Sequence, residues 1–279
     1  STFAGAGAVA AHWTGDNAAT WRDLRASVVG VAALALQGMP MTGPDQCGFE
    51  GDTTEELCSR WVAAGSLMPF SRVHNAKGFA PQELYRWGSD SPVASTARAA
   101  LGLRHRLLPH LYTLFYSAHA RGSLVAAPIF AAFPDLPGSY LTAAADRQFM
   151  LGAGLLVAPA MEKGATSQVV WLPGGGQVRS GSGSGRGLER GAEVWWRLSA
   201  EDPLAATRAT RGSLVEPVPM VCRSVRVATA AVGMNTNTST STSTTMLGPG
   251  VGRRFRRRVG GGCEVELDAP LGTVTSFAR

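Results

Sequence analysis

The segment that decides the fold is the hexapeptide His12-Trp13-Thr14-Gly15-Asp16-Asn17, in which a short strand leads into a loop that carries a carboxylate. A second segment has the same plan: Pro40-Met41-Thr42-Gly43-Pro44-Asp45-Gln46-Cys47-Gly48-Phe49. Each segment combines one acid with one aromatic residue just after an extended run. Barrel enzymes with parallel strands place their chemistry in loops of this kind, at the carboxyl ends of the strands.

Helical patterns alternate with strands in the first part of the chain. Strands are expected near residues 8–16, 38–42 and 69–74. Apolar residues at helical spacing, followed by Gly38 as a stop, predict a helix over residues 23–37. This alternation is typical of a parallel α/β unit.

Two further helices carry clear end signals. Thr53 or Thr54 is expected to cap the next helix, and Glu56 is placed for a capping box. A long helix is expected over residues 91–121, kinked at Pro109 and ended by Gly122.

The pattern changes after residue 123. Short apolar or alternating runs at 128–130, 154–158 and 168–172 predict an antiparallel β domain. Residues 174–191 are rich in Gly and Ser, and residues 235–245 form a Thr/Ser/Asn tract. Neither segment can bury much apolar surface, so neither is expected to contribute to a core.

The positive charge is confined to the second part of the chain. The net charge is +6, yet residues 1–160 hold 11 basic and 11 acidic residues. Five arginines fall within residues 253–258, flanked by glycines. Such a run can bind phosphate, but it is more typical of a solvated loop, so we predict no nucleic-acid partner. No apolar run reaches the roughly 18 residues of a membrane span.

The cysteines leave two interpretations open. A bridge between Cys47 and Cys58 would stabilise the fold by about 3 kcal/mol and imply an oxidising compartment; two free thiols fit the spacing equally well. Cys222 and Cys263 have no metal-ligand spacing. The three histidines of the long helix, His105, His110 and His119, do not recur with acids at ligand spacing, and we predict neither a metal nor a cofactor.

Eight segments, taken in order, resemble one enzyme family. They are Ser1-Thr2-Phe3-Ala4-Gly5, Ala11-His12-Trp13-Thr14-Gly15-Asp16-Asn17, Cys47-Gly48-Phe49, Thr54-Glu55-Glu56-Leu57-Cys58, Pro69-Phe70-Ser71-Arg72-Val73-His74-Asn75, Gln82-Glu83-Leu84-Tyr85, Leu103-Arg104-His105-Arg106-Leu107-Leu108-Pro109 and Arg147-Gln148-Phe149. The chain resembles glycoside hydrolase family 31, the family of α-glucosidases and α-xylosidases. The paired cysteines favour its acid-maltase and plant-type branch.

The resemblance implies an α/β part followed by an all-β part. Residues 1–122 would be the C-terminal half of a (β/α)₈ TIM barrel, and residues 123–279 a proximal antiparallel β-sandwich. Residues 195–198 and 265–271 are similar to strands of that sandwich. Low-complexity, disordered insertions are then expected at about 174–192 and 200–261, and the second of these contains the arginine run.

The resemblance also assigns roles to six residues. Asp16 would be the general acid/base of a retaining hydrolase, which needs a second carboxyl about 5–5.5 Å away. The sugar would be bound by Trp13, Asp45, Phe49, Arg72 and His74.

Each role has a purely structural alternative. Asp16 and Asp45 could be turn or capping aspartates, and Trp13 and Phe49 could be core residues. Arg72 would orient Asp16 or another acid by an ion pair, and a structural salt bridge fits equally well.

The sequence lacks the Trp-x-Asp-Met-Asn-Glu segment that carries the family's nucleophile. The resemblance therefore implies a fragment of a hydrolase that removes terminal α-linked glucose or xylose from oligosaccharides, inactive alone. Its partners would be the α-linked oligosaccharide and the missing N-terminal part of the same enzyme. The alternative is a non-catalytic carbohydrate-binding or interaction protein. The family and Cys47 with Cys58 imply the secretory pathway, with an extracellular, vacuolar or lysosomal destination.

Overall fold

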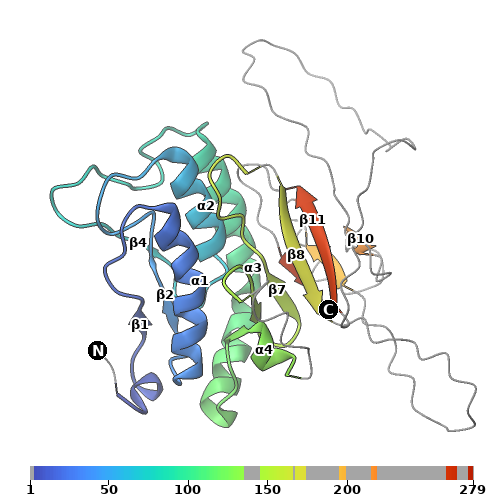
Figure 1. Cartoon of the computed structure of the whole chain (residues 1–279). Coiled ribbons are helices and arrows are strands. Elements are labelled where there is room, and N and C mark those ends of the chain that lie inside the picture. Colours follow the sequence, from blue (N-terminus) through green and yellow to red (C-terminus); the bar gives the residue numbers. More distant parts are fainter. Residues whose placement is uncertain are drawn as a thin grey trace, which may run out of the picture.

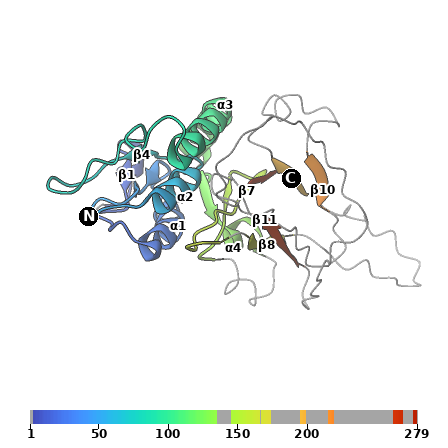
Figure 2. The same ribbon diagram turned by 90° about the horizontal axis from the view of Figure 1, so that it is seen from above.

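The structure, a computed structural model, describes residues 3–134, 145–165, 167–173, 195–198, 215–218, 262–268 and 276–278. Two parts lie side by side (Figure 1). One holds the helices α1 (Trp21–Leu36), α2 (Glu55–Gly65) and α3 (Pro92–Arg121) with short strands; the other is built from antiparallel strands. The turned view keeps the same division (Figure 2). In the part of the chain that the structure describes, no helix is long and apolar enough to cross a membrane.

The first part contains two pairs of parallel strands. Strand β1 (His12–Trp13) pairs with β2 (Thr42–Gly43), and β3 (Asp45–Gln46) pairs with β4 (Arg72–Val73). The expected parallel α/β alternation is therefore confirmed, although each strand has only two residues. A 3-10 turn, η1 (Ala6–Ala8), precedes β1.

Close backbone contact between these strands depends on a glycine. A Cβ atom on Gly43 would lie 2.0 Å from the carbonyl oxygen of Phe70, a distance that no real side chain tolerates. Gly43 therefore lets the segment that leads into β4 run directly beside β2.

The helix starts follow the expected capping chemistry, with one correction. Thr54 caps α2 because its hydroxyl accepts from the amide of Leu57. Glu56 is thus the second helical residue, one position too early for the capping box. It instead pairs with Arg60, with 3.4 Å between Nε and Oε1, and accepts from the amide of Gly164.

Helix α3 is a single helix that passes through Pro109. Ser91 caps its first turn by accepting from the amide of Ala94, and Gly122 ends it with a φ of 68°, a left-handed conformation that suits glycine. The expected ends are confirmed to within one residue.

One continuous core joins the two parts. It includes Leu24 and Val28 of α1, Trp61 of α2, and Phe149 from the antiparallel part, all fully buried. Helix α1 packs against strand β5. The antiparallel strands thus rest on the helical layer through shared apolar contacts, which stabilise both parts together.

The second part contains two antiparallel sheets. One has six strands in the order β10-β9-β12-β7-β6-β5, and the other pairs β11 with β8. Their bounds are β5 (Ala126–Pro128), β6 (Phe149–Leu151), β7 (Leu155–Val157), β8 (Ser167–Pro173), β9 (Trp195–Leu198), β10 (Val215–Val218), β11 (Gly262–Asp268) and β12 (Ser276–Ala278). The expected antiparallel pairing is confirmed.

Two expectations about this part need correction. Ile129 and Phe130 begin a short helix, α4 (Ile129–Ala132), instead of continuing a strand. Strand β10 lies within residues 200–261, where the resemblance implies a disordered insertion, and it pairs with β9. The rest of that insertion up to residue 261, including the arginine run at 253–258 and the Thr/Ser/Asn tract, lies outside the described residues, as does the insertion at 174–192.

Candidate active site

Asp45 and Arg72 form the centre of the site, at the paired strands β3 and β4. Their Cα positions are partners in the parallel ladder, and Nε of Arg72 lies 2.5 Å from Oδ1 of Asp45. Asp45 is fully buried, whereas the Arg72 side chain is 40% exposed. The cation therefore offsets much of the cost of burying the carboxylate. The ion pair of Arg72 is therefore with Asp45 and not with Asp16.

The second oxygen of Asp45, Oδ2, is buried and has no hydrogen-bond partner among the residues that the structure describes. A buried carboxylate oxygen without a donor is costly. A hydrogen bond from a ligand hydroxyl would satisfy this oxygen, but the atom is buried, so the hydroxyl can reach it only if a neighbouring side chain moves.

Aromatic rings flank this ion pair. The guanidinium carbon of Arg72 lies 6.0 Å from the ring centroid of Trp13 and 5.4 Å from that of Phe70. Trp13 remains 42% exposed, so it is not a core residue. Phe49 lies in the loop after β3 and His74 in the loop after β4, with 5.4 Å between their ring centroids. The five residues predicted to bind a sugar thus form two contact groups, one of Trp13, Arg72 and Asp45 and one of Phe49 and His74.

Asp16 lies in a different setting. It is exposed in the loop after β1, next to Gly15, whose φ of 95° is left-handed. Its carboxylate makes no hydrogen bond or ion pair with any residue that the structure describes. It is therefore not a capping aspartate, and it is free to meet a ligand.

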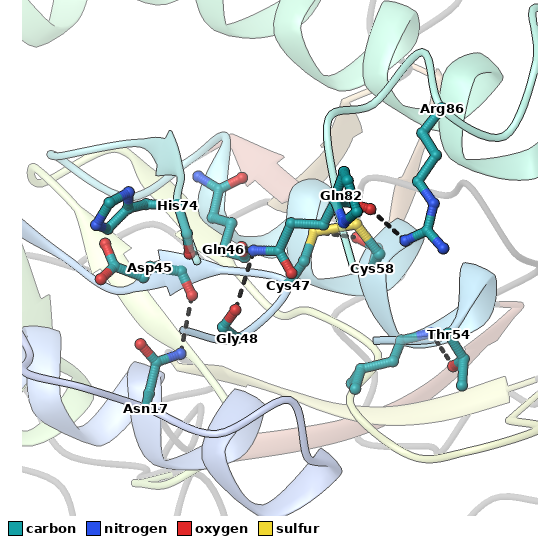
Figure 3. The surroundings of a disulfide bond; sticks show 12 residues. Asn17, Asp45, Gln46, Cys47, Gly48, Thr54, Cys58, His74, Gln82 and Arg86 are labelled. Carbon is teal, nitrogen blue, oxygen red and sulfur yellow. Dashed lines mark hydrogen bonds between the residues drawn. A yellow bond between two sulfur atoms is a disulfide. The ribbon is translucent and has the colours of Figure 1, made fainter. Parts of the chain in front are cut away.

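A disulfide fixes the loop after β3. Cys47 and Cys58 are joined, which ties this loop to α2 (Figure 3). Cys47 has a φ of 72°, and both cysteines are fully buried. The bridge resolves the alternative that the spacing left open, and it holds the backbone between Asp45 and Phe49.

Two amide side chains near Asp45, the half-buried Asn17 and the buried Gln82, were missed by the sequence reasoning. Asn17 donates from Nδ2 to the carbonyl of Asp45 at 2.8 Å. Gln82 donates from Nε2 to the carbonyls of Gln46, Gly48 and His74. Figure 3 shows the two amides on opposite sides of segment 45–48. Both residues occur within the motifs of the sequence, but nothing in their spacing indicates these contacts.

Arg104 of α3 holds the segment that leads into β4. Its guanidinium donates to the carbonyls of Ser66, Met68 and Pro69 at 2.6–2.8 Å. Burial lowers the pKa of Arg104. The carbonyls at the end of α2 carry partial negative charge, so a cation is favourable there. Arg104 thereby sets the path of the chain toward Arg72.

The site has the groups needed for proton transfer and for holding a polyhydroxylated ring. It offers one accessible carboxylate, a second carboxylate with a free oxygen, two aromatic faces and a histidine. Among the described residues, no group of three His, Cys, Asp or Glu side chains is placed to hold a metal ion.

Comparison with known proteins connects this arrangement to a family. Residues 1–114 match the family model described as the glycosyl hydrolases family 31 TIM-barrel domain, and residues 122–204 match the glycosyl hydrolase family 31 C-terminal domain. A probable alpha-glucosidase of Oryza sativa subsp. japonica is 54% identical over 175 residues, which cover 63% of this chain and 19% of that protein. Alpha-xylosidase 1 of Arabidopsis thaliana is 46% identical over 176 residues, covering 63% and 18%.

The solved structures agree with the sequence matches. The crystal structure of a glucosidase II alpha subunit superposes with a TM-score of 0.63 and 26% sequence identity, covering 96% of this chain and 21% of that one. The chain spans about a fifth of the length of these relatives. Both of its parts match the same family, in the order found there: the chain belongs to glycoside hydrolase family 31.

Proposed function

We propose that this site takes part in the hydrolysis of terminal α-linked glucose or xylose from oligosaccharides, with retention of configuration. The observation that carries the proposal is the Asp45–Arg72 pair: the buried carboxylate has one oxygen without a partner among the described residues, and the Arg72 guanidinium carbon lies 6.0 Å from the ring centroid of exposed Trp13. A pyranose hydroxyl can donate to that oxygen while the ring lies against the indole. The matches to α-glucosidases and an α-xylosidase support this substrate class.

Asp16 is the proposed general acid/base. In a retaining mechanism it protonates the glycosidic oxygen as a second carboxylate attacks the anomeric carbon, and it later takes a proton from the attacking water. Its exposed, unpaired carboxylate suits a group that must contact both. Arg72 is engaged by Asp45 and leaves Asp16 free.

The nucleophile must come from outside this sequence. No Trp-x-Asp-Met-Asn-Glu segment occurs in it, and double displacement needs both carboxyls. We therefore propose that this chain alone does not turn over substrate, and that the rest of the barrel is supplied by further sequence of the same enzyme. The antiparallel sheets would form the proximal β-sandwich.

The buried disulfide supports a secretory route, because such bonds persist in oxidising compartments. An extracellular, vacuolar or lysosomal destination is proposed on that basis.

The test is a chimera. Residues 1–172 replace the matching segment of the rice relative, and hydrolysis of 4-nitrophenyl α-glucoside is measured. Activity should appear, release the α-anomer first, and fall about 10²- to 10⁴-fold in Asp16→Asn. A chimera that keeps full activity after Asp16→Asn would refute the assignment. Turnover by this chain alone, lost in Asp16→Asn, would refute the proposed inactivity.

A second candidate is a non-catalytic sugar-binding protein. The free oxygen of Asp45 and the rings of Phe49 and His74 favour it, since they need no nucleophile to bind a sugar. Calorimetry with maltose separates the two: binding by this chain tighter than about 1 mM, or −4.1 kcal/mol, supports a binding protein. Measurable but weaker binding supports the enzyme fragment, and no measurable binding counts against both.

A further inference from the structure

Gln82 joins the segment at the end of β3 to the loop after β4, and these two segments are far apart in sequence. Its side-chain amide donates to the carbonyl of Gln46 at 3.2 Å and of Gly48 at 2.9 Å, both beside the disulfide, and to that of His74 at 3.0 Å. The residue is 2% exposed. Figure 3 places it directly over this backbone.

Three carbonyl oxygens accept hydrogen bonds from Gln82, so its side chain must be a donor, as the NH₂ group of a neutral amide is. The NH₂ group has two protons for three carbonyl acceptors, so at least one proton is shared. The amide oxygen Oε1 is buried and has no hydrogen-bond partner among the described residues. The donors of Gln82 are therefore the groups that the fold uses.

The two loops held by Gln82 carry the facing rings. Phe49 follows Gly48, and the His74 ring lies 5.4 Å from that of Phe49. The amide of Ala76 also donates to the carbonyl of Phe49 at 2.8 Å. Fixing the Gly48 and His74 carbonyls to one side chain therefore fixes the separation of the two rings.

We propose that Gln82 is a positioning residue that sets the Phe49–His74 wall of the sugar site. This inference rests on the function proposed above for its link to sugar binding, but its structural part can be tested without a ligand. Gln82 does not touch the substrate; it acts by placing two backbone carbonyls.

Gln82→Glu supplies a sharp test, because the shape is kept and the donors are removed. Above the pKa of the introduced carboxyl, a negative charge faces three carbonyl oxygens and the loops separate. Burial raises that pKa above the ordinary value of about 4.3. Below it, the protonated carboxyl donates one hydrogen bond, so the wall reforms as pH falls.

Gln148→Glu is the matched control. Gln148 is also 2% exposed, and its Nε2 also donates to a backbone carbonyl, that of Trp171, but in the antiparallel part. Gln82→Met removes the donors without adding charge, so it should shift the His74 signal by the same amount at both pH values.

The experiment follows the His74 ring by NMR in the intact chain, which has five histidines, with His74→Asn for assignment. The Phe49→Leu variant gives the position of the His74 signal in the absence of the ring-current effect of Phe49. At about pH 7.5 the signal in Gln82→Glu should move to that position, and at about pH 5 it should return at least halfway. His74, Asp45 and Arg72 are ionisable too, so each variant is compared with wild type at the same pH.

Gln148→Glu should leave the His74 signal in place at both pH values. The proposal is overturned if Gln82→Glu keeps the wild-type signal at the higher pH, or if Gln148→Glu moves it as far. Should circular dichroism show Gln82→Glu unfolded at the higher pH, Gln82→Met decides: an unmoved signal overturns the proposal.

A maltose titration of the same samples tests the link to sugar. Gln82→Glu should bind about tenfold more weakly than wild type at the higher pH, and approach wild type at the lower pH. Wild-type chain that does not bind maltose counts against the proposed function, while the His74 signal still decides the role of Gln82. If wild type and Gln82→Glu bind maltose with equal affinity while the His74 signal moves, only the role of Gln82 in sugar binding is overturned.

Discussion

The loops that follow β3 and β4 differ sharply from the loop that follows β1. The former are held by the disulfide, by Gln82 and by the Asp45–Arg72 pair. In the latter, Asp16 is exposed and makes no contact through its carboxylate with any described residue. The side of the site that is proposed to hold the sugar is thus fixed by contacts within this chain, whereas the carboxylate of Asp16, the proposed acid, makes none with the residues that the structure describes.

The largest effect is expected where the held loops meet the helices. Arg104→Met should lower the free energy of unfolding by about 4 kcal/mol, because three buried carbonyls lose charged donors. Urea unfolding measures it. Arg98→Met, on the exposed face of α3, is the control and should change stability by less than about 0.5 kcal/mol. Equal losses would show that Arg104 does not fix the segment before β4.

Removing the disulfide should have the next largest effect. Cys47→Ala with Cys58→Ala should cost about 3 kcal/mol, since the bridge closes a short loop. Thermal unfolding of the oxidised wild type and the double variant gives the difference. A loss below about 1 kcal/mol would mean that the loop after β3 is held by its hydrogen bonds alone.

The ion pair should contribute less, because Arg72 is partly exposed. Arg72→Met should cost about 2 kcal/mol by leaving the buried Asp45 carboxylate without its cation. Adding Asp45→Asn should recover part of this loss. A double-mutant cycle in urea reports the coupling, and additive losses would contradict a direct interaction.

The smallest effect on stability is expected in the loop after β1. Asp16→Asn should change the free energy of unfolding by less than about 0.5 kcal/mol, as for other surface substitutions. A destabilisation comparable to that of Arg72→Met would show that the loop after β1 is held as firmly as the loops after β3 and β4.

The sequence was sufficient for elements with strong local signals. Helical spacing and end residues located α1 and α3, and the loop expected after the first strand contains Asp16. Asp45, expected in a loop, instead begins strand β3. It failed where adjacent residues compete for one role. Thr53 and Thr54 are both good caps, and only the backbone decides that Thr54 is used. Ile129 and Phe130 are β-formers that nevertheless begin a helix after Pro128.

The site shows the same limit. The resemblance supplied the residues that are proposed to face the ligand, but not the partner of Arg72, which depends on register between β3 and β4. Asn17 and Gln82 act through backbone carbonyls. Such contacts leave no charge pattern or periodicity in the sequence, because any carbonyl is the same acceptor.

The most direct test of the contrast is a maltose titration of this chain, its Asp45→Asn variant and its Asp16→Asn variant, followed by NMR. Weak binding, on the order of millimolar, should become at least about tenfold weaker in Asp45→Asn and change less than about twofold in Asp16→Asn. Binding that depends on Asp16 as strongly as on Asp45, or no binding by the wild type, would contradict a sugar-holding side already built within the chain.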